Sequence, residues 1–352
     1  MAVLADVIDA AVGADTHRDT HTLEITTASG ITLATMTIAN TDEGSAQALA
    51  WIREHAPGPR VAAAVEGSRS YGVGLARALA ATGIQVIEIE QPRGRERRRG
   101  KSDAIDAHLA VIHALRLPAD RLPTPRADGD REALRILLGA RQELGVTHRR
   151  ALNQLRALLI TGNDIDRQLA RTKQFGQARL EALIHRGPVP GETREQDVRR
   201  TEATRLAIRV RDTGADLATN RVQLLQIVTD LAPGLLAKLG VGPISAAQAI
   251  VSWSHHGRCR TEAAFAALAG ASPLPASSGR TTRHRLNRGG DRALNCALHN
   301  IVLTRWRSCP RTRAYIERRR SEGRSTREIR RILKRYVARE LFRALNATAT
   351  PE

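Results

Sequence analysis

The sequence has 352 residues, with 55 lysines and arginines against 36 aspartates and glutamates, so its formal net charge is +19. Arginine makes up nearly all of the cations, and its planar, permanently charged side chain suits a polyanionic partner such as nucleic acid. An apolar fraction of 42% excludes a fully disordered basic protein, and nine aromatic residues exclude an extended base-stacking platform. Because the sequence shows neither a long apolar run nor a signal pattern, we expect a cytoplasmic protein without membrane contact.

The N-terminal third contains short apolar segments separated by turn residues, which is typical of strands that alternate with helices. Thr41 begins an amphipathic helix, and the alanine-rich segment 61–65 suits a strand that is covered on both faces. The predicted strands are 8–16, 21–27, 31–39, 61–65 and 84–89, and the predicted helices begin near 41, 71 and 102. We therefore expect an α/β domain with the element order β-β-β-α-β-α-β-α, which is that of the ribonuclease-H-like fold.

Four carboxylates fall where this element order would gather them. Asp15 ends the first strand, Glu66 ends the fourth, and Asp103 and Asp106 lie one turn apart on the last helix. Converging carboxylates repel one another unless cations lie between them, and their hard oxygen atoms suit Mg²⁺ or Mn²⁺. Two such ions can stabilise both oxygens of a phosphoryl displacement. Taken singly, each residue is an ordinary surface charge or helix cap, but the set of four predicts a catalytic metal site.

A basic run, QPRGRERRRGK at 91–101, lies between the fifth strand and the last helix of this domain. Such a run is commonly just a solvated face. Its position beside the carboxylates instead favours a strap that binds a phosphate backbone next to the metal ions. The cations of this strap are Arg93, Arg95, Arg97, Arg98, Arg99 and Lys101.

The middle of the chain is predicted to be helical. Pro118, Pro123 and Pro125 mark a boundary, after which leucines recur at helical spacing from 134 to 159. This stripe is either the face of a core helix or a coiled-coil arm that joins protomers. A second helical stretch, from about 194 to 230, is charged, and the whole segment resembles a spacer more than a chemical centre.

The C-terminal third begins with the segment LGVGPI at 239–244, which leads into an alanine-rich helix. Gly240 and Gly242 permit a tight turn, and a helix N-terminus presents free N–H groups to phosphate, as in a helix-hairpin-helix element. An ordinary interhelical turn is the alternative. Near the end, the segment 305–343 has a net charge of +11 while apolar residues still repeat at helical spacing. One face of this segment should therefore pack and the other bind phosphate.

Between these parts lies a turn that exposes hydroxyl groups among arginines. Ser277, Ser278 and Arg280 follow two prolines, and a Gly-Gly break lies further on between Arg288 and Arg292. Serine is a weak nucleophile unless a base, a metal ion or surrounding positive charge activates it. The segment is thus a candidate for nucleophilic chemistry, although taken alone such a turn is more commonly a flexible loop.

Together these motifs resemble those of the insertion sequence 110 family of transposases. The resemblance rests on two motif sets in the expected order, a DEDD quartet and the later P-x-x-x-x-S-G and R-G-G-D-R runs. It implies that the quartet is formed by Asp15, Glu66, Asp103 and Asp106. It also implies a catalytic serine that attacks DNA, carried over to Ser278, with Ser277 as the neighbouring alternative.

The resemblance further implies a DNA recombinase that is guided by a structured non-coding bridge RNA and joins double-stranded donor and target DNA as a homodimer or homotetramer. The implied domains are a RuvC-like catalytic domain at 1–118, a helical or coiled-coil arm at 119–234, a mainly helical serine transposase domain at 235–345 and a disordered tail at 346–352. Asn295 departs from the pattern, because members of the family commonly have an arginine there.

Other functions stay open at this level. A metal-dependent nuclease or Holliday-junction resolvase would use the quartet to activate water, and its serine segment would only bind nucleic acid. A non-catalytic nucleic-acid-binding module would not need an intact quartet. An ATPase of the sugar-kinase type shares the strand order, but the sequence contains no second glycine-rich phosphate loop.

Overall fold

A computed structural model describes residues 2–89, 103–126, 129–172, 175–275, 284–285 and 287–347, without the side chains of Asp103, Ala104, Arg121 and His284. The chain divides into two compact units. The first consists of the residues up to 132 together with 254–260, and the second of 133–253 with the residues from 261 onward. The domain boundaries at 118, 234 and 345 stay predictions. None of the helices in the described ranges is long and apolar enough to cross a membrane.

The first unit is built on a mixed five-stranded sheet. Its strands are β1 (Ala10–Thr16), β2 (Thr20–Thr27), β3 (Thr32–Ala39), β4 (Val61–Glu66) and β5 (Gln85–Ile89). They lie in the order β3-β2-β1-β4-β5. β1 pairs antiparallel with β2 and parallel with β4, so a hairpin continues into a parallel sheet. The expected α/β order is confirmed, and it is consistent with a ribonuclease-H-like DEDD domain.

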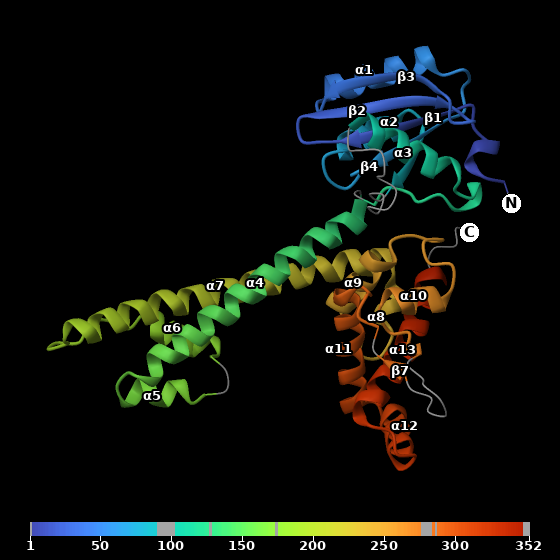
Figure 1. Ribbon diagram of the computed structural model, residues 1–352. Helices are drawn as coiled ribbons and strands as arrows, with labels where there is room; N and C mark the ends of the chain where they lie inside the picture. The colour runs from blue at the N-terminus through green and yellow to red at the C-terminus, as the bar shows by residue number, and fades with distance from the viewer. Residues whose placement is uncertain are drawn as a thin grey trace. The chain divides into compact units, whose positions relative to one another are not determined.

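Helices cover both faces of this sheet (Figure 1). They are α1 (Asp42–His55), α2 (Val73–Ala81) and α3 (Asp103–Leu115), with short 3₁₀ helices at Leu4–Asp6 and Ala119–Arg121. α1 and α2 pack on the face that carries Val12 and Val65. α3 packs on the opposite face, which carries Ala11 and Ala64. Because successive strand residues point to opposite faces, both faces of β1 and β4 are apolar and buried.

α3 crosses β1 at Gly13, where the two backbones approach closely. A Cβ atom on Gly13 would lie 2.1 Å from the carbonyl oxygen of Ala107 and 2.7 Å from Val111. Further along the helix, Val111 and Ala114 pack in one cluster with Ala11. α3 therefore runs antiparallel to β1, and its N-terminus lies toward the C-terminal end of that strand.

Gly13→Ala should destabilise the protein by about 3 kcal/mol, because the new methyl group would overlap backbone and force α3 away from the sheet. Urea unfolding, monitored by circular dichroism, measures this change in the free energy of unfolding. Gly74→Ala in α2 is the matched control, since a Cβ atom there meets nothing within 4 Å and should leave stability unchanged or slightly higher. Equal stability of the two variants would contradict the close approach of α3 and β1.

Most of the second unit's N-terminal half is a long antiparallel helical hairpin. Its helices are α4 (Gly129–Ile160), α5 (Asp164–Ala170), α6 (Gln177–Ile184) and α7 (Arg194–Leu231). α4 and α7 run side by side (Figure 1). Asn220 Nδ2 on α7 donates to the Leu137 carbonyl on α4 at 2.9 Å, and Arg199 Nη1 donates to the Leu158 carbonyl at 2.9 Å. Early residues of one helix thus meet late residues of the other.

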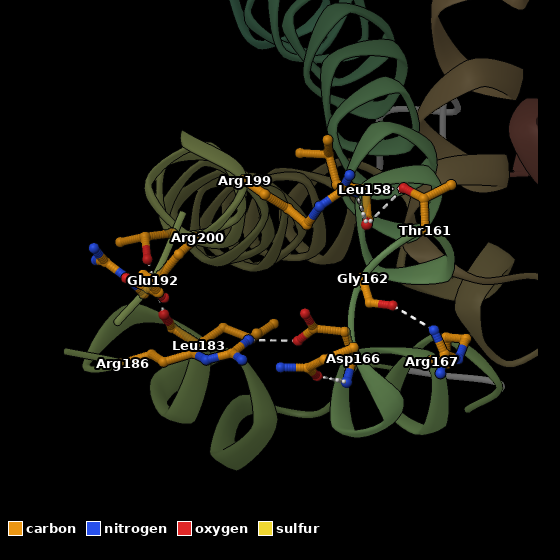
Figure 2. A network of polar contacts seen from close by, with 12 residues as sticks. Leu158, Thr161, Gly162, Asp166, Arg167, Leu183, Arg186, Glu192, Arg199 and Arg200 are labelled. Carbon is orange, nitrogen blue, oxygen red and sulfur yellow. Dashed lines mark hydrogen bonds and ion pairs between the residues drawn. The ribbon is translucent and has the colours of Figure 1, made fainter. Parts of the chain in front are cut away.

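Arginine side chains join the helices near the end of this hairpin (Figure 2). Arg199 also contacts the Thr161 hydroxyl, and Arg186 pairs with Asp166, which is 5% exposed. Beneath this network, leucines of α4 are buried against α6 and α7, in a cluster that includes Leu155 and Leu159. The part of the leucine stripe at this end therefore packs within one chain.

The rest of the second unit is mainly helical, as expected. It consists of α8 (Pro233–Leu236), α9 (Pro243–Trp253), α10 (Glu262–Leu268), α11 (Arg292–Ser308), α12 (Pro310–Ser321), α13 (Thr326–Ala347) and a small hairpin of β6 (Leu274–Pro275) and β7 (His284–Arg285). α11 packs on both α9 and α13. On α13 the residues Ile329, Leu333, Val337 and Leu341 are buried, so a four-residue spacing forms its packed stripe.

Candidate active site

Asp15 and Glu66 lie level with each other at the ends of neighbouring strands. β1 and β4 pair in parallel up to Ala14 and Val65, and one further residue on each strand brings Asp15 opposite Glu66. Thr16 Oγ1 donates to the Glu66 carbonyl at 2.7 Å and holds the two strand ends together. Since parallel strands lie about 4.8 Å apart, two carboxylates on the same face of the sheet come close to each other.

Both side chains belong to the face that α3 covers. On β1, Ala11 and Gly13 meet α3, so strand alternation assigns Asp15 to the same face. On β4, Ala64 packs with α3 residues, so Glu66 faces the same way. Asp15 is 4% exposed and Glu66 is 8% exposed, which is unusual for carboxylates.

The direction of α3 brings its N-terminal turn to this place. Gly13 is level with Ala107, and two strand residues rise by about as much as four helical residues, roughly 6 Å. The backbone of Asp103 is thus level with Asp15. Asp106 is 5% exposed, and its buried Oδ1 has no hydrogen-bond partner within the described part of the chain. The side chain of Asp103 lies outside that part.

A cavity of about 510 Å³ opens at the carboxyl ends of β1, β4 and β5. His17 lies at its edge, with Nε2 3.3 Å from Asp15 Oδ2 and a side chain that is 49% exposed. The loop after Glu66 is closed by Ser70, whose N–H donates to the Gly67 carbonyl at 2.8 Å. The lining residues are Asp15, Thr16, His17, Glu66, Gly67, Ser68, Arg69, Ser70, Tyr71, Glu88 and Ile89.

The donors gathered here fit a hard divalent cation. Buried carboxylate oxygens are the ligands that Mg²⁺ and Mn²⁺ prefer, and a buried carboxylate oxygen without a hydrogen-bond donor, such as Asp106 Oδ1, favours a positive partner. Among the side chains that the structure describes, no three His, Cys, Asp or Glu residues are grouped so that they could hold a metal ion. Asp15, Glu66 and Asp106 are buried carboxylates of the kind that such an ion prefers, and the metal site that they would form with Asp103 stays a prediction.

A second charged group at the cavity, around Glu88, was not predicted. The Glu88 side chain is 5% exposed, and it accepts a hydrogen bond from Arg126 Nε at 3.0 Å, while Arg69 Nε lies 3.1 Å away. Burial, helped by the charge of Arg126, lowers the pKa of Arg131 to about 10. A glutamate within the otherwise apolar strand β5 was the sign in the sequence that a buried charge needs a partner. The partner could not be predicted, because Arg126 lies 38 residues away in the sequence.

Glu88→Gln should lower the free energy of unfolding by about 3 kcal/mol at neutral pH, because it leaves the buried guanidinium of Arg126 without its carboxylate. Burial raises the pKa of Glu88, but the hydrogen bond and charge of Arg126 outweigh burial and hold this pKa below its ordinary value of 4.5. The stabilisation is therefore complete above the ordinary pKa and disappears as the pH falls through the lowered one.

Urea unfolding of wild type and Glu88→Gln across this pH range measures the effect, with Glu54→Gln on the exposed surface of α1 as the control. The gap between wild type and Glu88→Gln should close at acidic pH, while Glu54→Gln follows wild type throughout. A gap that is independent of pH would contradict the role of the charge.

Several predicted site residues lie outside the described residues. The segment 276–283, with both candidate serines and Arg280, connects the two strands of the β6–β7 hairpin, in which Leu274 pairs with Arg285. Roles for these residues stay predictions. The residues concerned are Ser277, Ser278, Arg280, Arg93, Arg95, Arg97, Arg98, Arg99 and Lys101.

Gly240 and Gly242 lie in the turn between α8 and α9. Arg305 Nε on α11 donates to the Leu239 carbonyl at 2.7 Å and fixes this turn against the helix. A Cβ atom on Gly240 would lie 3.2 Å from the Ile301 carbonyl oxygen, whereas one on Gly242 would meet nothing within 4 Å. The φ of Gly240 is +80°, a left-handed conformation that favours glycine, and phosphate binding at this turn stays a prediction.

The R-G-G-D-R run combines a structural residue with two exposed arginines. Asp291 caps α11 by accepting hydrogen bonds from the N–H groups of Ala293 and Leu294 at 2.9 Å, so it is not free for chemistry. Arg288 and Arg292 are exposed, and both line a cavity of about 650 Å³ in the second unit.

Asn295, which departs from the family pattern, is held at both ends of its amide. Its Nδ2 donates to the Ala269 carbonyl at 2.6 Å, and its Oδ1 accepts from Lys334 Nζ at 2.7 Å. A cation, Lys334 of α13, therefore lies beside residue 295.

Comparison with known proteins agrees with the motifs. Residues 12–162 match the family model DEDD_Tnp_IS110, described as a transposase, and residues 235–317 match the model of the transposase IS116/IS110/IS902 family. No curated protein matches the sequence. The first match spans Asp15, Glu66 and Asp106, and the second spans the β6–β7 hairpin and the R-G-G-D-R run. Since two models of this family match in the expected order and cover more than half of the sequence, the chain belongs to the IS110 family of transposases.

Proposed function

We propose that this transposase cuts and rejoins DNA strands through the hydroxyl of Ser278, assisted by Mg²⁺ or Mn²⁺ bound to Asp15, Glu66, Asp103 and Asp106. The observation that supports the proposal is that Asp15, Glu66 and Asp106 are all buried, with Asp15 and Glu66 at the ends of neighbouring parallel strands. Carboxylates that share a buried site repel one another, and a divalent cation would relieve that repulsion.

The carboxylates hold the metal ions in place and orient the DNA phosphate. When bound, the ions supply Lewis-acid stabilisation of the charge that builds up on the phosphate oxygens. The exposed imidazole of His17, 3.3 Å from Asp15, stands at the cavity edge where it can hydrogen bond a phosphate oxygen. In this proposal the basic residues of the 91–101 segment, with Arg280, Arg288 and Arg292, bind the DNA backbone.

In the strand-transfer step, Ser278 Oγ attacks the scissile phosphorus and forms a new P–O bond. The P–O bond to the leaving deoxyribose oxygen breaks, the serine proton is lost, and the leaving oxygen takes up a proton to become a free hydroxyl. One phosphodiester replaces another, so the ester bond energy is kept. Attack of an exchanged strand's hydroxyl on the phosphoserine then rejoins DNA without ATP and regenerates the serine. Ser277 is the alternative nucleophile.

Sequence choice in this proposal comes from base pairing between a structured bridge RNA and the two duplexes, while the protein binds backbone. The formal charge of +19 and the arginine-rich helices α12 and α13 support backbone binding. Two strands must be exchanged between two duplexes, so two active sites are required and we propose a homodimer or homotetramer.

The test is to trap the covalent species. Incubation of the protein with Mg²⁺, bridge RNA and labelled donor and target DNA should give a protein–DNA adduct that survives denaturation, and mass spectrometry should locate it on Ser278. A metal-dependent nuclease or resolvase would release hydrolysed DNA with no adduct, and that result would refute the serine mechanism. An adduct on Ser277 would move the nucleophile by one residue.

A further inference from the structure

The second unit contains a cavity of about 570 Å³ between α13 and the end of the β6–β7 hairpin at Pro273 and Arg285, here called the α13 cavity. This volume lies within the range of about 300–1,000 Å³ that is typical of small-molecule sites. Pro273 directly precedes β6 and Arg285 belongs to β7, so the cavity adjoins both strands that flank the serine segment.

Positive charge dominates the wall of the α13 cavity. Six lining side chains are cations (Arg285, Arg319, Arg324, Arg331, Lys334 and Arg335), and Glu328 is the single acidic residue among the described lining residues. Glu328 lies 3.5 Å from Arg324, so its charge is already matched. Arg319 and Arg335 also have carboxylate partners, in Glu322 and Glu262. The excess of cations that favours an anionic ligand therefore comes from Arg285, Arg331 and Lys334.

Lys334 donates to a neutral amide, whereas Arg324 lies beside the carboxylate of Glu328. Lys334 Nζ donates to Asn295 Oδ1 at 2.7 Å, and Asn295 is fixed by its own bond to the Ala269 carbonyl. Burial lowers the pKa of Lys334, and the nearby Arg330 lowers it further. Lys334 also borders the neighbouring cavity that contains Arg288 and Arg292, so it lies where the two cavities meet.

One side of the α13 cavity is apolar. Ile332 and Tyr336 lie one turn apart on α13 and both line the cavity. Each directly precedes a residue of the buried stripe, so each lies on a different face of the helix from that stripe. Tyr336 is 48% exposed and stands nearly perpendicular to Tyr315, with ring centroids 5.8 Å apart. Pro273 completes the apolar side. A flat apolar ligand group fits this surface.

A nucleotide has both required parts, a flat base and an anionic phosphate. We propose that the α13 cavity binds one unpaired nucleotide of a DNA strand, with its base against Tyr336, Ile332 and Pro273 and its phosphate on Lys334 and the neighbouring arginines. Strand exchange unpairs nucleotides beside the cut, and the cavity would hold one of them. The inference rests on the proposed function, and DNA is favoured over RNA because DNA is the substrate of a transposase.

The test measures binding of the full chain to a fluorescent single-stranded hexathymidylate in EDTA, with excess unlabelled blunt duplex to occupy non-specific basic surfaces. Asn295→Asp places a carboxylate beside Lys334 and neutralises its charge without truncating it, and Lys334→Ala removes the charge. Each should weaken single-strand binding about tenfold, as should Tyr336→Ala, while Tyr336→Phe keeps the ring and should bind normally.

Arg327→Ala is the matched control, because Arg327 is an exposed cation on the same helix outside the α13 cavity. It should weaken binding by no more than about twofold, since an exposed contact contributes little. Circular dichroism and thermal unfolding confirm that each variant is folded, and Tyr336 is exposed enough for truncation to leave the fold intact.

The inference is overturned if the cavity variants bind like wild type, if Arg327→Ala loses as much as they do, or if blunt duplex binding falls in parallel. Equal binding of hexauridylate, with equal loss in the variants, would overturn the assignment to DNA. Because no metal is present and no adduct forms in this assay, its result is independent of the serine mechanism. If wild type forms adducts but the cavity variants bind single-stranded DNA normally, only the proposed nucleotide site is refuted. If the cavity variants lose binding but wild type forms no adducts, only the serine mechanism is refuted.

Discussion

Replacing Ser278 with alanine should abolish covalent protein–DNA adducts and reduce strand exchange by at least about 10³-fold, while DNA and RNA affinity stay near wild type. The reason is that the hydroxyl oxygen forms the new bond to phosphorus, and the methyl group of alanine is not a nucleophile. Binding depends on many arginines spread over the chain, so loss of one hydroxyl leaves it unchanged. Denaturing gels with labelled DNA measure the adducts, and fluorescence anisotropy measures the affinity.

Ser277→Ala is the matched control for this experiment. It removes the same group one residue earlier in the same segment, and it should retain adducts and strand exchange. The opposite pattern, with adducts lost in Ser277→Ala and kept in Ser278→Ala, would reassign the nucleophile. Adducts that persist in the double variant would exclude this segment from the covalent chemistry.

Asp106→Asn should remove metal-dependent strand cleavage, by at least about 100-fold, and should weaken Mg²⁺ binding measured by calorimetry. The substitution keeps the shape of the side chain but removes the negative charge from a buried oxygen that has no described hydrogen-bond donor. Asp15→Asn should behave in the same way, because Asp15 is level with Glu66 on the same face of the sheet.

Glu24→Gln is the control for the metal experiments. Glu24 is also a buried carboxylate on the α3 face, but its oxygen already accepts from Thr32 Oγ1 at 2.6 Å and lies 2.8 Å from His108 Nδ1. Its replacement should leave the Mg²⁺ titration unchanged. Cleavage that is unaffected by EDTA, or a wild-type titration for Asp106→Asn, would contradict the metal site.

Local pattern in the sequence was sufficient to predict the elements of the first unit. β1 and β4 are apolar on both faces, and turn residues separate the strands, so their positions follow from composition over short windows. The juxtaposition of Asp15 and Glu66 also followed, since the carboxyl ends of neighbouring parallel strands share one edge of the sheet. Helical spacing also predicted that Asp106 lies on the same face of α3 as Asp103, because the two residues are one turn apart.

Only the tertiary structure decided which residues far apart in the sequence contact each other, because the residue types alone do not specify a partner. An arginine 38 residues from Glu88 pairs with it, and a lysine 39 residues from Asn295 binds its amide. Any of the 55 lysines and arginines could have done so by chemistry alone, and the folded backbone selected among them. The sequence by itself determined where the strands of the first unit form and that Asp15 and Glu66 end neighbouring strands, because these depend on local periodicity and on the order of the elements. The charge cluster at β5, the pairing of α4 with α7 and the α13 cavity depend on packing across long separations, which no local pattern encodes.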